Sequence, residues 1–184
     1  MKKLLLLITL IFTTAAFAQV EKATSGDLLE FTFTPNLQGG DMFSTDSNML
    51  GGYEGLFTYR NLDTSTRWRA QFIFDAEEDY EDYMMLAAFY GKEKHYDGSD
   101  RLDTFTGYEG GLYYEDFGGD SDADWGVIGG VFAGANYYIA NNLYIGLEAR
   151  YMIVLVDGRT SVGLQSGNGG VSGVNAMMSI GFKL

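Results

Sequence analysis

The sequence has 184 residues, enough for one domain, and its 25 acidic and 12 basic residues give a formal net charge of −13, which repels nucleic acid and excludes a basic phosphate-binding surface. The absence of cysteine excludes a disulfide framework and a thiolate metal site. The 25 glycines, the single proline and an aromatic content of 15% are unlike a disordered acidic chain and favour a fold rich in strands.

Residues 1–18 have the pattern of a secretory signal peptide. Lys2 and Lys3 form the positively charged N-terminal region, and residues 4–12 form the apolar core. Residues 16–18 provide a small-residue cleavage site before Gln19. The apolar run is too short to span a bilayer, and no cysteine follows it for attachment of a lipid. We therefore expect a mature domain of residues 19–184. Its net charge is −15, because loss of the two lysines leaves 10 basic against 25 acidic residues.

After Gln19, apolar and polar residues alternate with a period of two in segments of roughly ten residues, which is typical of strands in a transmembrane barrel. The alternation is most regular in residues 143–155 and in residues 173–184. Turn-like clusters separate the segments. The predicted strands are residues 28–34, 50–60, 67–75, 83–94, 104–115, 125–139, 143–155 and 173–184. We therefore predict an all-β fold, a closed antiparallel up-and-down barrel of about eight strands.

The two faces of these strands differ in kind. One face is long, apolar and aromatic, as in Leu147, Tyr151 and Ile180, and the other combines glycine with glutamate and arginine. The interior of an eight-stranded barrel holds only its own side chains or one small ligand, so the large apolar set cannot fit inside. We therefore expect the apolar face to contact lipid. A soluble, lipocalin-like barrel that binds a ligand is the alternative.

The lengths of the connecting segments predict the orientation of the barrel. Residues 61–65, 97–103 and 141–142 form short polar turns, which lie on the periplasmic side of such barrels. The longer connections are residues 35–49, 76–82, 116–124 and 156–170. We expect these to be extracellular, which places both termini in the periplasm.

Three stretches carry a resemblance to a known family: residues 91–102, residues 137–148 with an Asn141-Asn142 pair, and residues 180–184. With this strand layout, the chain resembles the small outer-membrane β-barrel proteins of Bacteroidota, an OmpA-like or porin-like family. The resemblance implies an outer-membrane location and a last strand that barrel-insertion machinery reads. The peptidoglycan-binding domain of larger OmpA-like proteins is not expected after that strand.

Acidic and basic residues recur on the polar faces, where they are expected to point into the lumen. An unpaired charge in a narrow interior is costly, so these groups should form hydrogen-bonded ion pairs. Such pairs would either plug the lumen or line a narrow path for ions. The predicted lumen network consists of Glu30, Glu54, Arg67, Arg69, Glu109, Glu148 and Arg150.

His95 is the only histidine and thus the only candidate for histidine-dependent catalysis. A catalytic barrel of the lipid A deacylase or omptin type needs a histidine with serine or carboxylate partners near the extracellular rim. His95 falls at the periplasmic end, where we expect an exposed turn residue. We therefore predict no enzymatic activity.

Two connecting segments are strongly acidic: residues 75–82 hold six carboxylates in eight residues, and residues 115–124 hold five in ten. Clustered carboxylates suit Ca²⁺, and Asp120, Asp122 and Asp124 are the candidate ligands. These three lack the glycine and the bidentate glutamate of an EF-hand loop. Hydrated surface loops are expected, and weak divalent binding that bridges lipopolysaccharide is the alternative.

The sequence thus predicts a non-enzymatic integral outer-membrane barrel with a structural or interaction role in the cell envelope and no cofactor. A narrow porin for ions or small solutes and the soluble ligand-binding barrel are the alternatives. The expected partners are outer-membrane lipid, lipopolysaccharide, the insertion machinery and a larger outer-membrane complex.

Overall fold

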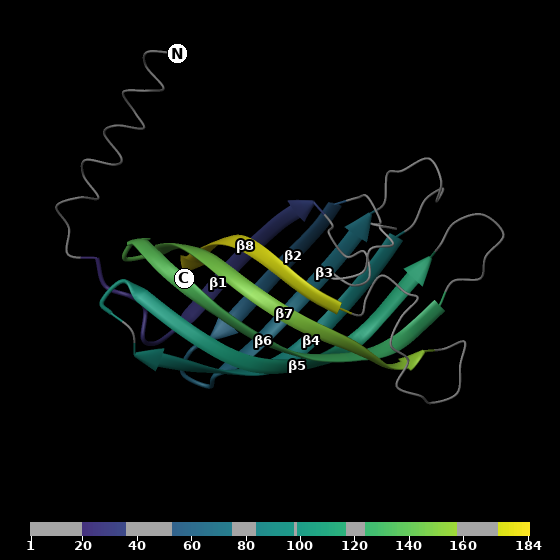
Figure 1. The fold of residues 1–184 in the computed structure, drawn as a ribbon. Coiled ribbons are helices and arrows are strands. Elements are labelled where there is room, and N and C mark those ends of the chain that lie inside the picture. Colours follow the sequence, from purple (N-terminus) through teal and green to yellow (C-terminus); the bar gives the residue numbers. More distant parts are fainter. Residues whose placement is uncertain (1–19, 36–52, 75–83, 98, 117–123, 158–172) are drawn as a thin grey trace, which may run out of the picture.

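The computed structural model describes residues 20–35, 53–74, 84–97, 99–116, 124–157 and 173–184, which form one closed antiparallel barrel (Figure 1). Each strand pairs with its neighbours in chain order, and β1 also pairs with β8. The predicted eight-stranded up-and-down barrel is confirmed. Its strands are β1 (Asp27–Pro35), β2 (Tyr53–Asn61), β3 (Thr66–Phe74), β4 (Met84–Asp97), β5 (Leu102–Asp116), β6 (Asp124–Ala140), β7 (Leu143–Asp157) and β8 (Gly173–Lys183).

The strands differ in length around the barrel. β4 and β5 pair from Met84 with Asp116 to Asp97 with Asp103, so this hairpin extends further than its neighbours. The seam that closes the barrel is short, because β1 pairs with β8 only from Leu28 to Thr32. In the part of the chain that is described, no helix is long and apolar enough to cross a membrane.

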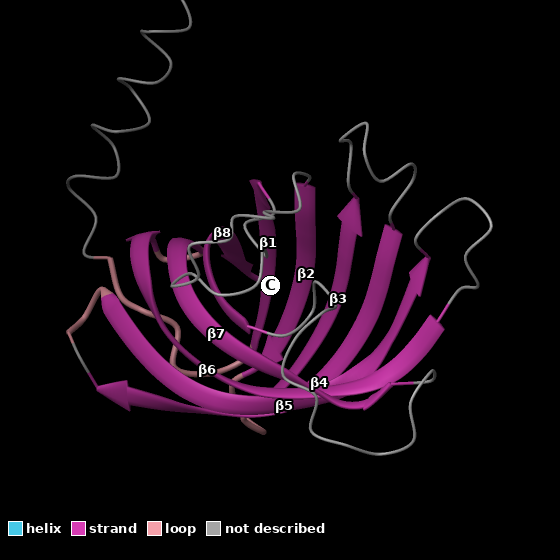
Figure 2. Ribbon diagram, turned by 45° about the vertical axis from the view of Figure 1, so that its right-hand side comes forward, coloured by secondary structure: helices cyan, strands magenta, loops and turns pink. Residues whose placement is uncertain are grey.

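One end of the barrel, here called the turn end, carries three short turns. They connect β2 to β3, β4 to β5 and β6 to β7, and the C-terminus lies at the same end, on the left of Figure 1. Figure 2 shows that the described residues consist of strands and short connecting segments. Since Asp97 and Asp103 belong to β4 and β5, the predicted turn over residues 97–103 is shorter than expected.

A segment before β1, residues 20–26, crosses the turn end and is here called the N-terminal strap. Val20 and Ala23 of the strap are buried against Leu28, Tyr138 and Tyr144. The positive φ of Gly26 (88°) allows the chain to bend from the strap into β1. Hydrogen bonds join the strap to all three turns: Leu62 N to Gly26 O (2.9 Å), Lys22 N to Asp100 O (2.5 Å) and Glu21 N to Asn141 Oδ1 (3.2 Å).

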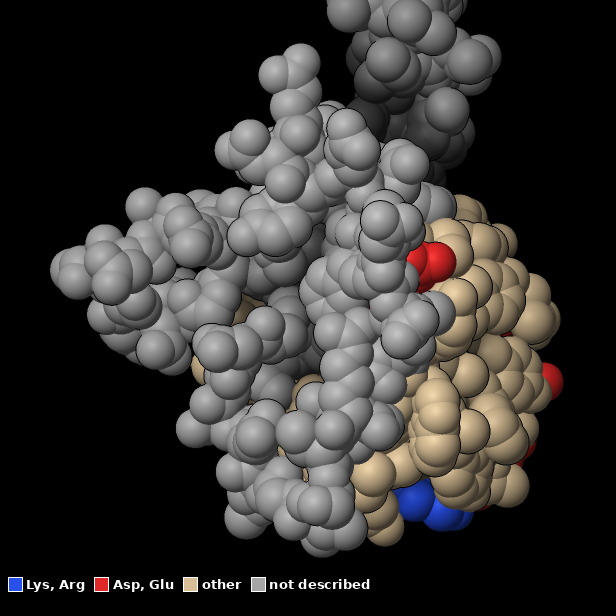
Figure 3. Space-filling view, turned by 90° about the vertical axis from the view of Figure 1, so that its right-hand side faces the viewer, with Lys and Arg blue, Asp and Glu red and all other residues tan. Residues whose placement is uncertain are grey.

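The outer wall of the barrel is apolar and aromatic. Trp68 is 57% exposed, and Tyr108, Leu112 and Met178 are each 63% exposed. Figure 3 views the barrel from the end opposite the turn end, and the described surface there is mostly uncharged, with a few acidic side chains and one basic spot. On β4 this apolar wall ends after Tyr90, because the next two outward positions are lysines.

Glycines on the inner face make room for large side chains from neighbouring strands. A Cβ atom at Gly181 would overlap the ring of Tyr144, and one at Gly107 would overlap the ring of Phe132. The high glycine content is therefore partly a packing requirement of the narrow interior.

Candidate functional site in the barrel lumen

A layer of charged side chains crosses the middle of the lumen. Because side chains alternate along a strand, the residues opposite the apolar wall all point inward. Four arginines and four glutamates of the described residues meet there, each at most 4% exposed, so their formal charges balance. These residues are Arg60, Arg67, Arg69, Arg150, Glu30, Glu93, Glu109 and Glu148.

Arg69 of β3 forms the best-defined pairs in this layer. Its NH1 donates to Glu109 Oε1 at 2.9 Å, and its NH2 donates to Glu148 Oε1 at 2.7 Å. Arg67 NH2 donates to the other oxygen of Glu148 at 2.5 Å. Glu148 of β7 therefore receives two arginines from β3, which lies across the lumen and not beside it in the sheet.

Arg60 of β2 extends the network toward the turn end. Its NH2 lies 3.1 Å from Glu30 Oε2 and 3.5 Å from Glu148 Oε2, and its Nε lies 3.8 Å from Glu93 Oε2. Tyr144 donates its hydroxyl to Glu30 at 3.1 Å. Each carboxylate is thus held by groups from more than one strand, which a charge buried in a narrow interior requires.

Aromatic rings cover the guanidinium groups of this layer. Arg60 Cζ lies 4.2 Å from the centre of the Phe105 ring, and Arg67 Cζ lies 4.1 Å from the centre of the Phe132 ring. Cation–π contacts of this kind stabilise a cation that has lost its water. The rings also fill space beside the charges.

Apolar layers lie on both sides of the charged layer. Away from the turn end, Ile73, Met85, Phe89 and Ile128 belong to one buried cluster. At the turn end, residues of the strap pack against Tyr138 and Tyr144 in a second cluster. The interior thus has the order apolar, charged, apolar along the barrel.

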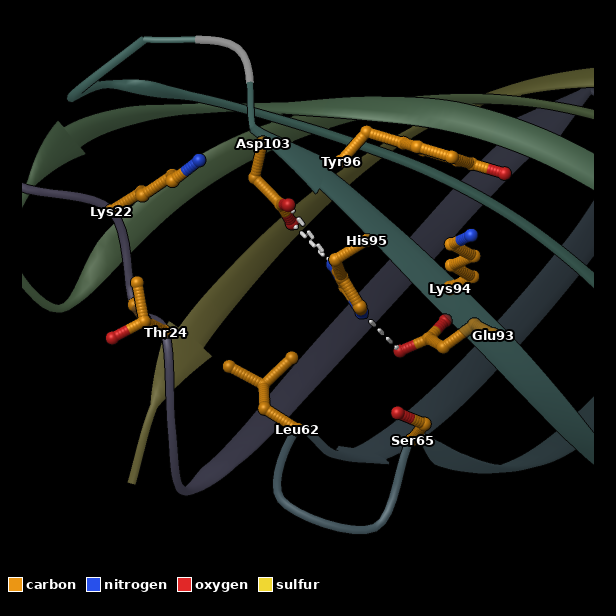
Figure 4. A pocket seen from close by; sticks show the side chains of 10 residues that line it. Lys22, Thr24, Leu62, Ser65, Glu93, Lys94, His95, Tyr96 and Asp103 are labelled. Carbon is orange, nitrogen blue, oxygen red and sulfur yellow. Dashed lines mark hydrogen bonds and ion pairs between the residues drawn. The ribbon is translucent and has the colours of Figure 1, made fainter.

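His95 differs from its sequence prediction. It was expected to be an exposed turn residue, but it lies in β4 with a side chain only 22% exposed. Its Nδ1 lies 2.9 Å from both oxygens of Asp103, and its Nε2 lies 3.1 Å from Glu93 Oε1 (Figure 4). The exposed-turn prediction is wrong because β4 and β5 continue past Lys94, which turns the odd-numbered residues of this hairpin inward.

The two carboxylates determine the charge of His95. Burial alone lowers the pKa of the imidazole, but hydrogen bonds and negative charge from Asp103 and Glu93 outweigh it and raise the pKa from 6.5 to about 9. His95 lies beyond the apolar wall, since its neighbour Lys94 is an exposed outward residue. A pocket of about 330 Å³ between His95 and the strap gives it access to solvent at the turn end (Figure 4).

The positions of the other candidates can now be stated. Among the predicted lumen residues, Glu30, Arg67, Arg69, Glu109, Glu148 and Arg150 have buried side chains, and Arg150 NH1 lies 3.5 Å from Glu109 Oε1. Glu54 is in β2, but its side chain lies outside the description. Asp120 and Asp122 also lie outside the described residues, and of Asp124 only its place at the start of β6 is described. In the described ranges, no group of three or more histidine or acidic side chains is arranged to hold a metal ion.

Sequence reasoning missed two members of the charged layer and the histidine site next to it. Arg60 lies on the same face of β2 as Thr58, so the two-residue period of this strand could have placed it in the lumen. Glu93 lies near the end of the predicted strand 83–94 but was not singled out, and Asp103 was assigned to a turn; the longer β4–β5 hairpin places both side chains inside.

Comparison with known proteins adds a structural likeness. No family model matches the chain, and no curated protein matches it. Among solved structures, the chain is similar to Neisserial surface protein A, with 13% identity, a TM-score of 0.54, and coverage of 86% of this chain and 94% of that one. It also matches the N-terminal β-barrel domain of Pseudomonas aeruginosa OprF, with 13% identity, a TM-score of 0.47, and coverage of 88% and 98%. The likeness to the Neisserial protein shows a common fold.

Proposed function

We propose that this protein is an integral outer-membrane barrel with a closed lumen and a structural or interaction role in the cell envelope. The observation that carries the proposal is the inverted distribution of its side chains. Trp68 and Leu112 are 57% and 63% exposed, whereas Arg60 and Arg67 are fully buried. A barrel in water favours the opposite arrangement, because exposed apolar surface and buried charge both cost free energy.

A closed barrel is suited to a membrane because its strands satisfy one another's backbone hydrogen bonds without water. The predicted signal peptide supports export, and a barrel supports an outer-membrane location. Since short turns lie on the periplasmic side in such proteins, we place the turn end, and with it the C-terminus and the strap, in the periplasm. The regular outward face of β8 is the segment that we expect insertion machinery to recognise.

The layered interior supports a closed lumen over a narrow porin. Each arginine of the middle layer lies within ion-pair distance of a glutamate, and the apolar cluster around Met85 and Phe89 offers a hydrated ion no partner. The strap crosses the turn end and leaves the pocket beside His95. The residues brought together are ion pairs without an activated nucleophile, which supports a non-enzymatic role.

Membrane fractionation tests the proposed location. The full-length chain, produced in a Gram-negative host, should sediment with the outer membrane and remain there after washing with urea or carbonate. Once extracted in detergent, it should migrate differently in gels before and after heating, as folded barrels do. Recovery as a detergent-independent protein in the periplasmic fraction would contradict the proposal and favour the soluble ligand-binding barrel.

A further inference from the structure

Two lysines stand together on the outer wall, where its apolar part ends. Lys92 and Lys94 occupy successive outward positions of β4, directly after Tyr90. Among the outward positions of the described strands, no other two in succession carry charges of the same sign. The chain as a whole has a net charge of −13, so this cationic spot differs in sign from the protein that bears it.

Neighbouring groups hold both ammonium groups close to the wall. Lys92 Nζ donates to the carbonyl oxygen of Thr64 at 3.1 Å. Lys94 Nζ lies 5.4 Å from the centre of the Tyr96 ring. Each lysine retains donors for an additional acceptor, because an ammonium group has three N–H bonds.

Hydroxyl groups flank the lysines on the adjacent strands. In the β3–β4 register Lys92 pairs with Thr66, and in the β4–β5 register Lys94 pairs with Thr106. The hydroxyl of Tyr96 lies 2.9 Å from that of Thr106. The surface therefore combines two cations with several hydroxyl groups, which is a suitable set of contacts for a phosphodiester.

The wall next to the lysines is apolar and aromatic. The rings of Trp68 and Tyr90 lie 4.7 Å apart, and Tyr108 follows on β5 with 63% exposure. Further along the same strands, Ala88 pairs with the exposed Leu112. A molecule with a phosphate at one end and hydrocarbon at the other would match this order of surfaces.

We propose that the β4–β5 wall binds an anionic glycerophospholipid, with its phosphate on Lys92 and Lys94 and its acyl chains against Tyr90, Tyr108 and Leu112. This inference rests on the membrane placement proposed above. The turn end then faces the periplasmic leaflet, where glycerophospholipids are found. Basic residues just outside the hydrocarbon region attract anionic lipid in this way.

Native mass spectrometry of the detergent-purified barrel tests the proposal. The protein is mixed with equal amounts of phosphatidylglycerol and phosphatidylethanolamine, and the bound lipids are compared. We expect retention of phosphatidylglycerol, and a reduction on the order of tenfold in the Lys92→Gln/Lys94→Gln variant. The Lys92→Arg/Lys94→Arg variant should restore binding, because arginine keeps the charge and donates to phosphate.

A matched control removes the same charge elsewhere at the turn end. Arg101→Gln/Lys183→Gln should leave the lipid preference unchanged, and the heat-dependent gel shift should show that every variant is folded. An equal loss in this control, or undiminished phosphatidylglycerol binding without Lys92 and Lys94, would overturn the site. Lysine-dependent preference for lipopolysaccharide over phosphatidylglycerol would overturn the assigned lipid. A barrel that is soluble without detergent would instead contradict the membrane placement itself.

Discussion

His95 provides a prediction about pH that can be worked out from its contacts. Its imidazole lies between Asp103 and Glu93 at 2.9 and 3.1 Å, and these carboxylates raise its pKa from 6.5 to about 9. The folded barrel therefore binds the proton more tightly than the unfolded chain does. The resulting stability is fully present below pH 6.5 and is lost as the pH rises through about 9.

The size of this effect follows from the two pKa values of His95. A tenfold change in proton affinity corresponds to about 1.4 kcal/mol. The rise in the pKa of His95 from 6.5 to about 9 therefore sets an upper limit of roughly 3.5 kcal/mol on this contribution, and partial exposure of the ring reduces it. Loss of the proton also leaves two carboxylates facing each other across a neutral ring.

Urea unfolding of the refolded barrel in detergent micelles, followed by tryptophan fluorescence, measures this contribution. The free energy of unfolding of the unchanged protein should fall by about 2–3 kcal/mol between pH 6 and pH 9.5. His95→Gln should be less stable at pH 6 and should show little change over the same range. Parallel curves for the two proteins would refute the assignment of this pH dependence to His95.

Three further predictions concern the lumen and the outer wall. Glu148→Gln removes the negative charge shared by Arg60, Arg67 and Arg69 and should lower the free energy of unfolding by roughly 3–5 kcal/mol in the same urea assay; a loss below about 1 kcal/mol would contradict the ion network. Gly181→Ala should destabilise the barrel by about 1–3 kcal/mol because its Cβ meets the ring of Tyr144, and most of that loss should disappear when the change is made in a Tyr144→Ala background. Leu112→Arg in the middle of the apolar wall should cost about 2–4 kcal/mol in lipid vesicles, whereas Thr106→Arg beyond it should cost about 1 kcal/mol or less; equal costs would argue against lipid around this wall.

The barrel itself could be predicted from the sequence because the strands of such a barrel show a simple alternation of apolar and polar residues. The outward residues Leu147, Tyr151 and Ile180 follow this period without interruption. The inward positions of Arg69 and Glu148 follow from the same alternation. Their pairing does not, since β3 and β7 are not neighbours in the sheet and meet only across the lumen.

The rest of the interior depends on the lengths of paired strands and on how side chains pack, which the alternation of residues does not predict. Glu93 lies near the end of a predicted strand and Asp103 lies in a predicted turn, and the pairing of β4 with β5 turns both side chains inward. The apolar layer around Ile73 and Met85 interrupts the expected polar face. The strap over the turn end has no strand period, so its contacts with three separate turns could not be foreseen.

Single-channel recording in planar bilayers tests the closed lumen most directly. The refolded protein should give silent bilayers while its heat-dependent gel shift shows that it is folded, because a lumen closed by paired charges and apolar layers would offer ions no hydrated path. Arg150→Ala, which removes a guanidinium from the charged layer, is recorded beside it. Steady, ion-selective openings of the unchanged protein, enlarged in Arg150→Ala, would contradict the closed lumen and identify a narrow pore lined by Glu148 and Arg150.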